Sequence, residues 1–348
     1  MKVLVTGHHG YIGSVLAPMV RDAGHDVVGL DTFFYRGCDF GSSDELQPSL
    51  STDLRDVTPA DLAGFDAIVH LGALSNDPLG DLNSEWTYEI NGAGTVSLAR
   101  VAKEAGVPRF VFASSCSMYG ASGGSELLGE SAPLRPLTPY AESKVSAEAA
   151  LRDLAGDGFA PVSMRNATVY GASPRLRLDI VLNNLVAWAH TTGAIRLQSD
   201  GTPWRPLVHV QDVARAAIEL LAAPDELVVG EAYNIGSAEQ NYRIGELAEV
   251  VHRRLPHCEV TYAEGASPDP RSYRVDFGKF ARAFPGFRFE WTAERGADEL
   301  ASAYESVGLE ADDLVGGYRY IRLNQLKRLL DAGRLDDGLR WASATAPA

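Results

Sequence analysis

A tyrosine, Tyr140, stands four residues before a lysine, Lys144, in the stretch TPYAESKVSAEAALRDL at residues 138–154. This stretch predicts a helix, because Thr138 can cap it, Pro139 suits the first helical position and good helix formers follow. A separation of four residues puts the phenol and the ammonium on the same face of the helix. The spacing alone also fits a solvated helix face, so a catalytic interpretation needs support from the rest of the chain.

A phenol beside a cation can act as an acid and base in the transfer of a hydride to or from a carbinol carbon. A free phenol has a pKa of about 10 and is a poor base at neutral pH. The ammonium of Lys144 favours the phenolate, and Ser115, at the end of an earlier apolar run, can hydrogen-bond the reacting oxygen. Without Tyr140 and Lys144, Ser115 would fit equally well as a strand-end serine bonded to backbone.

The elements that must position these residues form an alternating pattern. The apolar runs KVLVTG, DVVGLD, AIVHLGA and RFVFASS are separated by helical patterns at 14–23 and 86–105, and MRNATVYGAS and EAYNIGS read as later strands. Such alternation predicts an α/β fold with a doubly wound parallel (Rossmann) sheet. We expect a cofactor domain at 1–173, to which 202–236 returns. A smaller, interleaved substrate-binding lobe and a C-terminal tail take up 174–201 and 237–348.

Composition excludes several classes of protein. The 348 residues are 45% hydrophobic and carry a formal net charge of −15, which argues against nucleic acid or an anionic membrane as a partner. The sequence contains no run of about 18 apolar residues, and it opens directly on a strand without a leader. Three cysteines that are far apart, Cys38, Cys116 and Cys258, fit neither a disulfide framework nor a zinc site. We therefore expect a cytoplasmic protein with no metal.

A glycine-rich turn follows the first strand. In TGHHGYIGS, Gly7, Gly10 and Gly13 flank Tyr11 and Ile12, and small residues there let the backbone approach a pyrophosphate at the start of the next helix. Asp31 closes the second strand, where a carboxylate accepts hydrogen bonds from ribose hydroxyls and repels a 2′-phosphate. The pattern predicts NAD rather than NADP as cofactor. The positive charge of its nicotinamide ring would favour the phenolate of Tyr140 further.

Together these motifs resemble the extended short-chain dehydrogenase/reductase family, and within it the nucleotide-sugar epimerases and dehydratases, such as UDP-galactose 4-epimerase. The resemblance covers about residues 1–290. The motifs that carry it are TGHHGYIG, Asp31, DLRD at 53–56, HLGA at 70–73, Asn91, SSCSMYG at 114–120, PYAESK at 139–144 and RPLVHVQDVARA at 205–216.

The resemblance implies a role for each matching residue. Tyr140, Lys144 and Ser115 would be catalytic, and Lys144 and Tyr140 would also contact the cofactor. The implied cofactor-binding residues are Gly7, Gly10, Tyr11, Ile12, Gly13, Asp31, Asp53, Leu54, Leu71, Gly72, Ala73 and Asn91. A nucleotide-diphosphate sugar would contact Thr168, Asn184, Arg205, Asp269 and Arg271, and the enzyme is expected to be a homodimer.

Departures from the family's motifs bear on the reaction. The family's 4,6-dehydratases carry Asp-Glu after the catalytic hydroxyl, and its decarboxylases keep a Glu two positions after it, but this chain has Cys116 and Ser117 there. A thiol and a hydroxyl cannot supply the carboxylate acid–base steps of elimination. Cys116 could be a base or a small packing residue, and packing is the better interpretation. The sugar-site Asn of the epimerases aligns with Thr168 and their last phosphate-binding Arg with Ala266, so Arg271 is a candidate substitute.

These observations predict an NAD-dependent nucleotide-diphosphate-sugar 4-epimerase, which oxidises C4 transiently and reduces the keto-sugar from the other face. Two alternatives stay open: a nucleotide-sugar ketoreductase that exchanges its cofactor at each turnover, and a non-catalytic NAD-sensing protein on the same fold. Retention of bound cofactor would distinguish an epimerase from a ketoreductase. Non-catalytic NAD-sensing proteins usually lose the Tyr or the Lys, and this chain has both. The tail from about Glu310 has apolar positions at helical spacing, which indicates packing or a dimer contact.

Overall fold

The structure is a computed structural model, and it describes residues 1–41, 48–75, 80, 82–122, 126–267 and 271–342. Its central feature is a parallel sheet of seven strands in the order β11-β7-β5-β4-β1-β2-β3. These strands are β1 (Lys2–Thr6), β2 (Asp26–Asp31), β3 (Ser49–Ser51), β4 (Ala67–His70), β5 (Arg109–Ser115), β7 (Ala160–Asn166) and β11 (Glu231–Ile235). The chain order reverses at β1 and β4, so the carboxyl ends of these two strands flank a topological switch point. The predicted fold class is confirmed.

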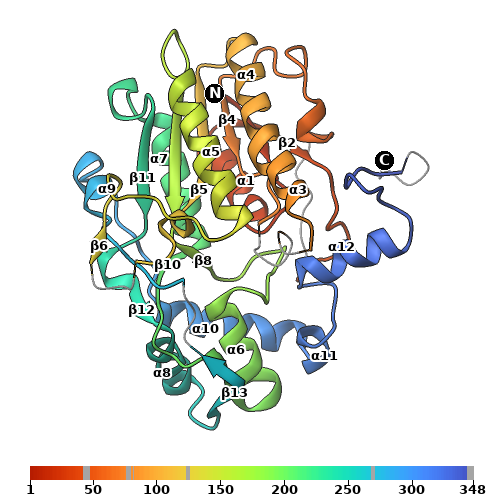
Figure 1. The fold of residues 1–348 in the computed structure, drawn as a ribbon, viewed down its shortest axis with the longest axis vertical. Helices are drawn as coiled ribbons and strands as arrows, with labels where there is room; N and C mark the ends of the chain where they lie inside the picture. The colour runs from red at the N-terminus through yellow and green to blue at the C-terminus, as the bar shows by residue number, and fades with distance from the viewer. Residues whose placement is uncertain (42–47, 76–79, 81, 123–125, 268–270, 343–348) are drawn as a thin grey trace.

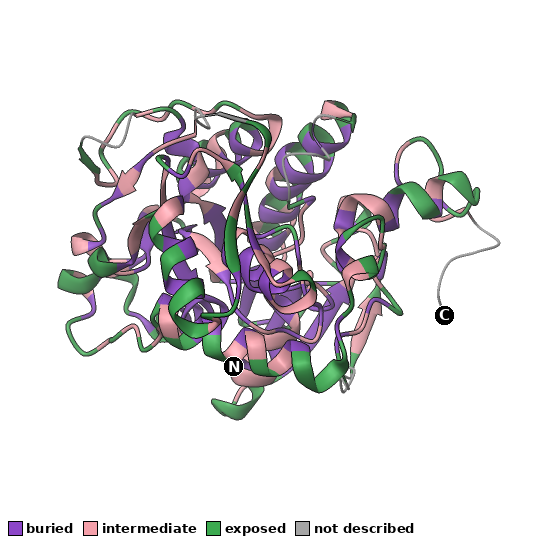
Figure 2. Cartoon of the chain, turned by 90° about the horizontal axis from the view of Figure 1, so that it is seen from below, coloured by how far each residue is buried: buried purple, intermediate pink, exposed green. Residues whose placement is uncertain are grey.

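Helices cover both faces of this sheet (Figure 1). On one face, α1 (Gly13–Asp22) and α7 (Val210–Ala222) pack against apolar side chains of β1, β5 and β7. On the other, α4 (Thr95–Glu104) and α5 (Pro139–Leu154) pack against β1, β4 and β5. The strands are apolar on both faces because both are covered, and Figure 2 shows these buried positions at the centre of the molecule.

A smaller lobe lies below the sheet in Figure 1. Its core is formed by α6 (Val181–Thr192), α8 (Ile244–Arg254) and α10 (Ala293–Val307), which pack with the two-stranded sheet of β9 (Ala194–Ser199) and β13 (Glu259–Ser267). A three-stranded sheet of β8 (Thr168–Tyr170), β10 (Trp204–His209) and β12 (Asn241–Arg243) joins the lobe to the larger domain. The chain crosses between the two parts several times.

Shorter elements connect these layers. They are η1 (Leu54–Asp56), α3 (Ser84–Thr87), the π-helical stretch η2 (Tyr88–Gly94), η3 (Cys116–Tyr119), β6 (Leu127–Leu128), η4 (Asp225–Leu227), η5 (Ala238–Gln240), β14 (Arg274–Val275), α9 (Gly278–Ala283) and α11 (Ala311–Leu314). The strands β6 and β14 pair in parallel.

The first part of the C-terminal tail, with Leu314 and Tyr320, packs in the core of the lobe, and the part from α12 (Arg322–Asp331) onward packs on the cofactor domain. Leu326, Leu329, Leu335 and Leu339 are buried there with Leu54 and other side chains of that domain. Figure 1 shows α12 beside α3, away from the core of the lobe. The division expected from the sequence groups the whole tail with the lobe. The buried leucines of α12 and of the segment after it instead have their apolar partners on the other domain, so this part of the tail packs there.

Candidate active site

A cavity of about 1190 Å³ lies between the carboxyl ends of the central strands and the smaller lobe. The predicted cofactor residues in its wall are Gly7, Gly10, Tyr11, Ile12, Gly13, Asp31, Asp53, Leu54, Leu71, Gly72 and Ala73. The catalytic candidates Ser115, Tyr140 and Lys144 also line it, as do the substrate candidates Thr168, Asn184, Arg205 and Arg271. Residues far apart in the sequence thus meet in one space, large enough for more than one small ligand.

The glycine-rich turn has the shape that a pyrophosphate requires. Gly7 has a φ of 70°, which favours glycine, and a Cβ there would lie 2.8 Å from the backbone nitrogen of Gly72. A Cβ on Gly13 would lie 2.1 Å from the carbonyl oxygen of Gly7. Helix α1 begins at Gly13, which lines the cavity, so the positive end of the helix dipole faces the place an anion would occupy. The turn therefore fits the phosphates of NAD.

Asp31 is held rigidly at the end of β2. The backbone N–H of His9 donates to its Oδ2 at 3.0 Å, and that of Phe33 donates to its Oδ1 at 2.8 Å. Each carboxylate oxygen still has a lone pair for a ribose hydroxyl. The position of Asp31 in the cavity wall thus suits the diol of an adenosine ribose.

Asn91 lies behind the cavity wall. Its side chain is fully buried in the π-helical stretch η2, accepts from the N–H of Leu74 at 2.8 Å and donates to the carbonyl of Leu74 at 2.8 Å. It does not line the cavity, whereas Leu71, Gly72 and Ala73 do. Asn91 therefore fixes the loop that follows β4, and π-helical turns are frequent at functional sites.

Helix α5 presents Tyr140 and Lys144 to the cavity. The helix spans Pro139–Leu154, and the Thr138 hydroxyl caps it by accepting from the N–H of Ala141 at 3.2 Å, as predicted. The ammonium of Lys144 lies 5.6 Å from the centroid of the Tyr140 ring and donates to the carbonyl of Ala113 at 2.8 Å. Both side chains face the carboxyl end of β5.

Burial of Lys144 makes its proton labile. The side chain is 2% exposed, and burial lowers its pKa from 10.5 to about 7. His70 lies nearby, and burial, followed by the charge of Lys144, lowers the pKa of His70 to about 3. Hydrogen bonds to Thr6 and Thr95 hold this neutral imidazole in place. The neutral ring of His70 therefore places no second positive charge beside Lys144.

We expect one lysine of the cofactor-free protein to titrate near neutral pH, since burial disfavours the charged form of Lys144. The chain contains only five lysines, so ¹³C-labelled lysine Cε signals can be followed one by one by NMR. Lys144→Met should remove the signal that titrates near pH 7. If all five lysines of the wild type titrate above pH 9 or so, the burial argument is wrong.

Ser115 sits where β5 ends, and the two residues after it differ in their surroundings. The Ser115 hydroxyl donates to Oγ of Ser117 at 2.9 Å and accepts from the N–H of Ser117 at 3.1 Å. Cys116 is fully buried and donates to the carbonyl of Arg165 at 3.0 Å. Burial raises the pKa of its thiol well above the usual range. The prediction that Cys116 is a packing residue is confirmed.

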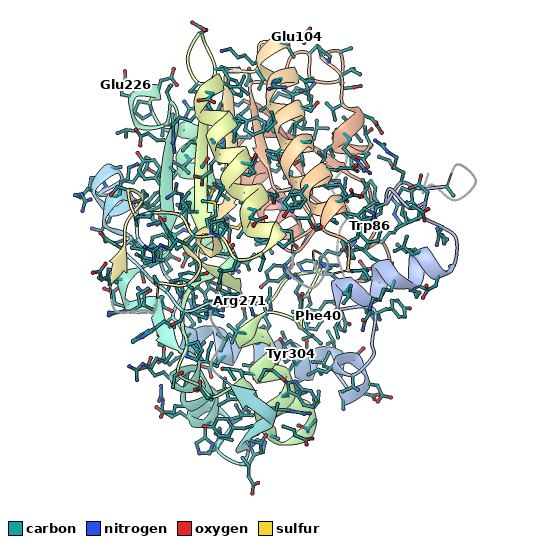
Figure 3. All side chains as sticks on the ribbon, in the orientation of Figure 1. Phe40, Trp86, Glu104, Glu226, Arg271 and Tyr304 are labelled. Atoms are coloured by element: carbon teal, nitrogen blue, oxygen red, sulfur yellow. The ribbon has the colours of Figure 1, made fainter. Side chains whose placement is uncertain are left out.

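The substrate candidates come from different elements of the lobe and its linking sheet. Thr168 lies on β8, Asn184 on α6 and Arg205 on β10. Figure 3 shows Arg271 at the junction between the two parts of the molecule. Asp269 lies outside the residues that the structure describes.

The cavity wall also contains three arginines that sequence reasoning missed, Arg177, Arg196 and Arg322. Arg177 donates to both carboxylate oxygens of Asp179, at 2.9 and 2.8 Å, and to Oγ of Ser75 at 3.0 Å. The guanidinium of Arg322 lies 4.0 Å from the centroid of the Tyr35 ring. The Arg-x-Asp spacing could have indicated the first pair. No local pattern in the tail marks Arg322 as a site residue.

Metal-ligand clusters and membrane-spanning helices are both absent from the described residues. Within the described ranges, no group of three or more His, Cys, Asp or Glu side chains is arranged to hold a metal ion. Across the same residues, no helix combines the length and the apolar character needed to cross a bilayer.

Comparison with known proteins identifies the family. Residues 3–236 match the NAD dependent epimerase/dehydratase family. An uncharacterized UDP-glucose epimerase of Bacillus subtilis is 30% identical over 69% of this chain and 78% of its own. The UDP-glucose 4-epimerase of Streptomyces lividans is 29% identical over 74% of this chain and 82% of its own. The structure of a dTDP-glucose 4,6-dehydratase from Streptomyces venezuelae with NAD bound has a TM-score of 0.75, at 26% identity over 90% of this chain and 99% of that one.

The chain belongs to the NAD-dependent epimerase/dehydratase family. It is an NAD-dependent enzyme of the extended short-chain dehydrogenase/reductase type that acts within nucleotide-sugar chemistry. Its relatives at similar identity include epimerases, dehydratases and a decarboxylase, so the family alone does not select the reaction.

Proposed function

We propose that this enzyme is a nucleotide-diphosphate-sugar 4-epimerase. The observation that carries the proposal is the pair of residues that follows Ser115. Cys116 is buried away from the cavity and bonded to backbone, and Ser117 presents only a hydroxyl. Neither can protonate a departing hydroxyl group or take a proton from a neighbouring carbon at neutral pH, which elimination requires.

The other carboxylates of the cavity support the same conclusion. Within the described residues, those in its wall are Asp31, Asp53 and Asp179. Asp31 lies at the ribose position, and Asp53 is held by the side chain of Arg55. The ion pair of Asp179 with Arg177 stabilises its ionised form. A carboxyl group free to act as base or acid in elimination is therefore missing from the described walls, whereas a 4-epimerase needs no such carboxyl group.

The chain's own residues supply the proton transfers of epimerisation. The phenolate of Tyr140 takes the proton of the sugar's C4 hydroxyl, becomes the neutral phenol and later returns the proton. Ser115 hydrogen-bonds the same oxygen, and the ammonium of Lys144 stabilises the phenolate. The glycine-rich turn and Asp31 would hold NAD, whose chemistry would be the reversible transfer of the C4 hydride. Arg205 and Arg271 hold the substrate's diphosphate, while Thr168 and Asn184 contact the rest of the substrate.

A screen of nucleotide sugars tests this proposal. UDP-, dTDP-, GDP- and CDP-hexoses are incubated with the purified enzyme without added cofactor, and products are followed by NMR. We expect one of them to give its C4 epimer. A requirement for added NADH or NADPH, with release of a reduced sugar, would show a ketoreductase instead.

We also expect the enzyme to bind NAD at least about tenfold more tightly than NADP, because the carboxylate of Asp31 repels a 2′-phosphate. Calorimetry on protein stripped of cofactor measures both affinities. Asp31→Asn removes the charge and keeps the shape of the side chain, so it should reduce the preference for NAD over NADP. Equal or tighter binding of NADP by the wild type contradicts the assignment of Asp31.

The remaining expectations concern assembly, organisation and location. We propose a homodimer, which sedimentation velocity would detect as twice the 37.4 kDa of one chain. The proposed domain division is the one stated from the sequence, with the segment from Arg322 onward reassigned to the cofactor domain. Three free, buried cysteines support a reducing compartment, so we propose a cytoplasmic location.

A further inference from the structure

The C-terminal segment Arg322–Trp341, here called the C-terminal clasp, packs against the half of the cavity that Asp31 and Asp53 line. We propose that the clasp belongs to the cofactor site. In this proposal Arg322 faces the phosphates of bound NAD, and the rest of the clasp holds the adenosine-side walls, so that the cofactor stays bound through turnover. The proposal rests on the placement of adenosine at Asp31 and Asp53 proposed above.

The clasp contacts the loop that follows β2. The indole N–H of Trp341 donates to the carbonyl of Thr32 at 2.5 Å, and the Trp341 ring centroid lies 5.7 Å from that of Phe34. The side-chain amide of Gln325 donates to the carbonyl of Phe34 at 2.9 Å. Thr32 and Phe34 both line the cavity directly after Asp31. The clasp therefore fixes the backbone that would flank the adenosine ribose.

A second set of contacts reaches Asp53. Arg55 donates to both carboxylate oxygens of Asp53, from Nε at 2.9 Å and from Nη2 at 2.6 Å. The same guanidinium donates to the carbonyls of Gly338, at 2.9 Å, and Leu339, at 3.3 Å. Arg340 forms an ion pair with Asp56. One network thus joins Asp53, an implied cofactor-binding residue, to the clasp.

The conformation of the clasp is closely specified. Leu339 is fully buried with a φ of 53°, a backbone conformation that a leucine rarely adopts. Such a conformation persists only where the surrounding contacts enforce it. Trp86 contributes by donating from its indole N–H to the carbonyl of Asp337 at 2.6 Å, and Figure 3 shows Trp86 close to α12. The clasp is therefore an integral part of the cofactor domain.

Arg322 has an unsatisfied donor that points to an anionic ligand. Its side chain is 3% exposed and lines the cavity, and its Nη2 donates to the carbonyl of Arg175 at 2.9 Å. Its Nη1 has no hydrogen-bond partner among the described residues. A buried guanidinium is costly unless its donors are paired, and phosphate oxygens are well suited to pair with it.

The position of Arg322 favours the phosphates of the cofactor. The segment that contains Arg175 crosses the glycine-rich turn, since Oγ of Ser173 donates to the carbonyl of Tyr11 at 2.7 Å. Tyr35, against which Arg322 packs, follows Asp31 in the loop after β2. Arg322 is thus held between the two segments that would flank the pyrophosphate and the ribose.

The rate at which NAD leaves the protein tests the clasp. Each variant is loaded with labelled NAD, freed of excess and mixed with unlabelled NAD, and the label released is followed in time. We expect Arg322→Gln to speed release by about ten- to a hundredfold, as the loss of a charge-assisted hydrogen bond predicts. Trp341→Phe keeps the ring but loses the indole N–H, and Trp341→Ala loses both, so release should quicken in that order.

Two control variants isolate the effect of the clasp on NAD release. Lys327→Gln removes a cation from an exposed position of the same helix and should leave the release rate within about twofold of the wild type. Trp291→Ala removes an indole stacked on His209, remote from the clasp, and reports the effect of lost stability alone. Melting temperatures are measured for all variants.

Release that quickens in the Arg322 and Trp341 variants, but not in the controls, supports the clasp. Unchanged release in the Arg322 variant and in the two Trp341 variants overturns the proposal. It is also overturned if Trp291→Ala speeds release equally at the same loss of melting temperature, or if Arg322→Gln weakens only UDP binding. A wild type that binds no NAD would refute the cofactor site itself, a result distinct from failure of the clasp.

Discussion

Tyr140→Phe is expected to lower the turnover rate by roughly 10²–10⁴-fold, because it deletes the hydroxyl that takes and returns the substrate's proton. The ring keeps its place on α5, so the melting temperature should barely change. NAD should still bind, since the glycine-rich turn and Asp31 are untouched. Steady-state assays with an active nucleotide sugar, together with thermal unfolding, measure both quantities.

Tyr88→Phe is the matched control for this substitution. The Tyr88 hydroxyl donates to Glu142, which also lies on α5, but Tyr88 is 42% exposed and outside the cavity. Its loss should leave turnover within about twofold of the wild type, since surface contacts contribute little. Retention of most of the wild-type rate by Tyr140→Phe would refute the catalytic assignment. A large loss in both variants would show that α5 had been disturbed.

Local patterns in the sequence were sufficient to predict which residues around the glycine-rich turn and α5 line the cavity. Gly7 and Gly13 tolerate no side chain, Asp31 follows a buried strand, and Thr138 caps a helix whose spacing pairs Tyr140 with Lys144. Each of these features depends on a few neighbouring residues. The parallel sheet was predictable for a related reason, since strands covered on both faces are apolar throughout.

The missed residues depend on contacts between distant segments. Arg322 lies more than 280 residues from the loop it touches, and nothing around it in the sequence distinguishes it from a surface arginine of an amphipathic helix. The apolar spacing of the tail predicted packing, which the structure confirms, but could not indicate which surface it covers. The π-helical turn around Asn91 likewise has no periodicity that sequence patterns detect.

The second large effect concerns the fate of the hydrogen at C4. With an active nucleotide hexose deuterated at C4, we expect a product of unchanged mass that keeps the deuterium at C4, now in the opposite configuration. Mass spectrometry measures the mass, and NMR locates the label. Tyr140→Phe serves as the blank, because it should form little product under the same conditions.

The expected result follows from what lies next to the sugar. Dehydration needs one group to protonate the departing hydroxyl and another to take a proton from C5, and carboxyl groups of suitable pKa usually do both. After Ser115 this chain provides a buried thiol and a hydroxyl. The carboxylates in the described cavity wall are Asp31, which accepts from two backbone N–H groups, Asp53, which is held by Arg55, and Asp179, which is held by Arg177. Loss of the mass of water would therefore mean that a group outside this set performs elimination. Loss of carbon dioxide would mean decarboxylation. Washout of the deuterium would mean that the hydrogen leaves the enzyme between the two steps, and any of these results defeats the epimerase proposal.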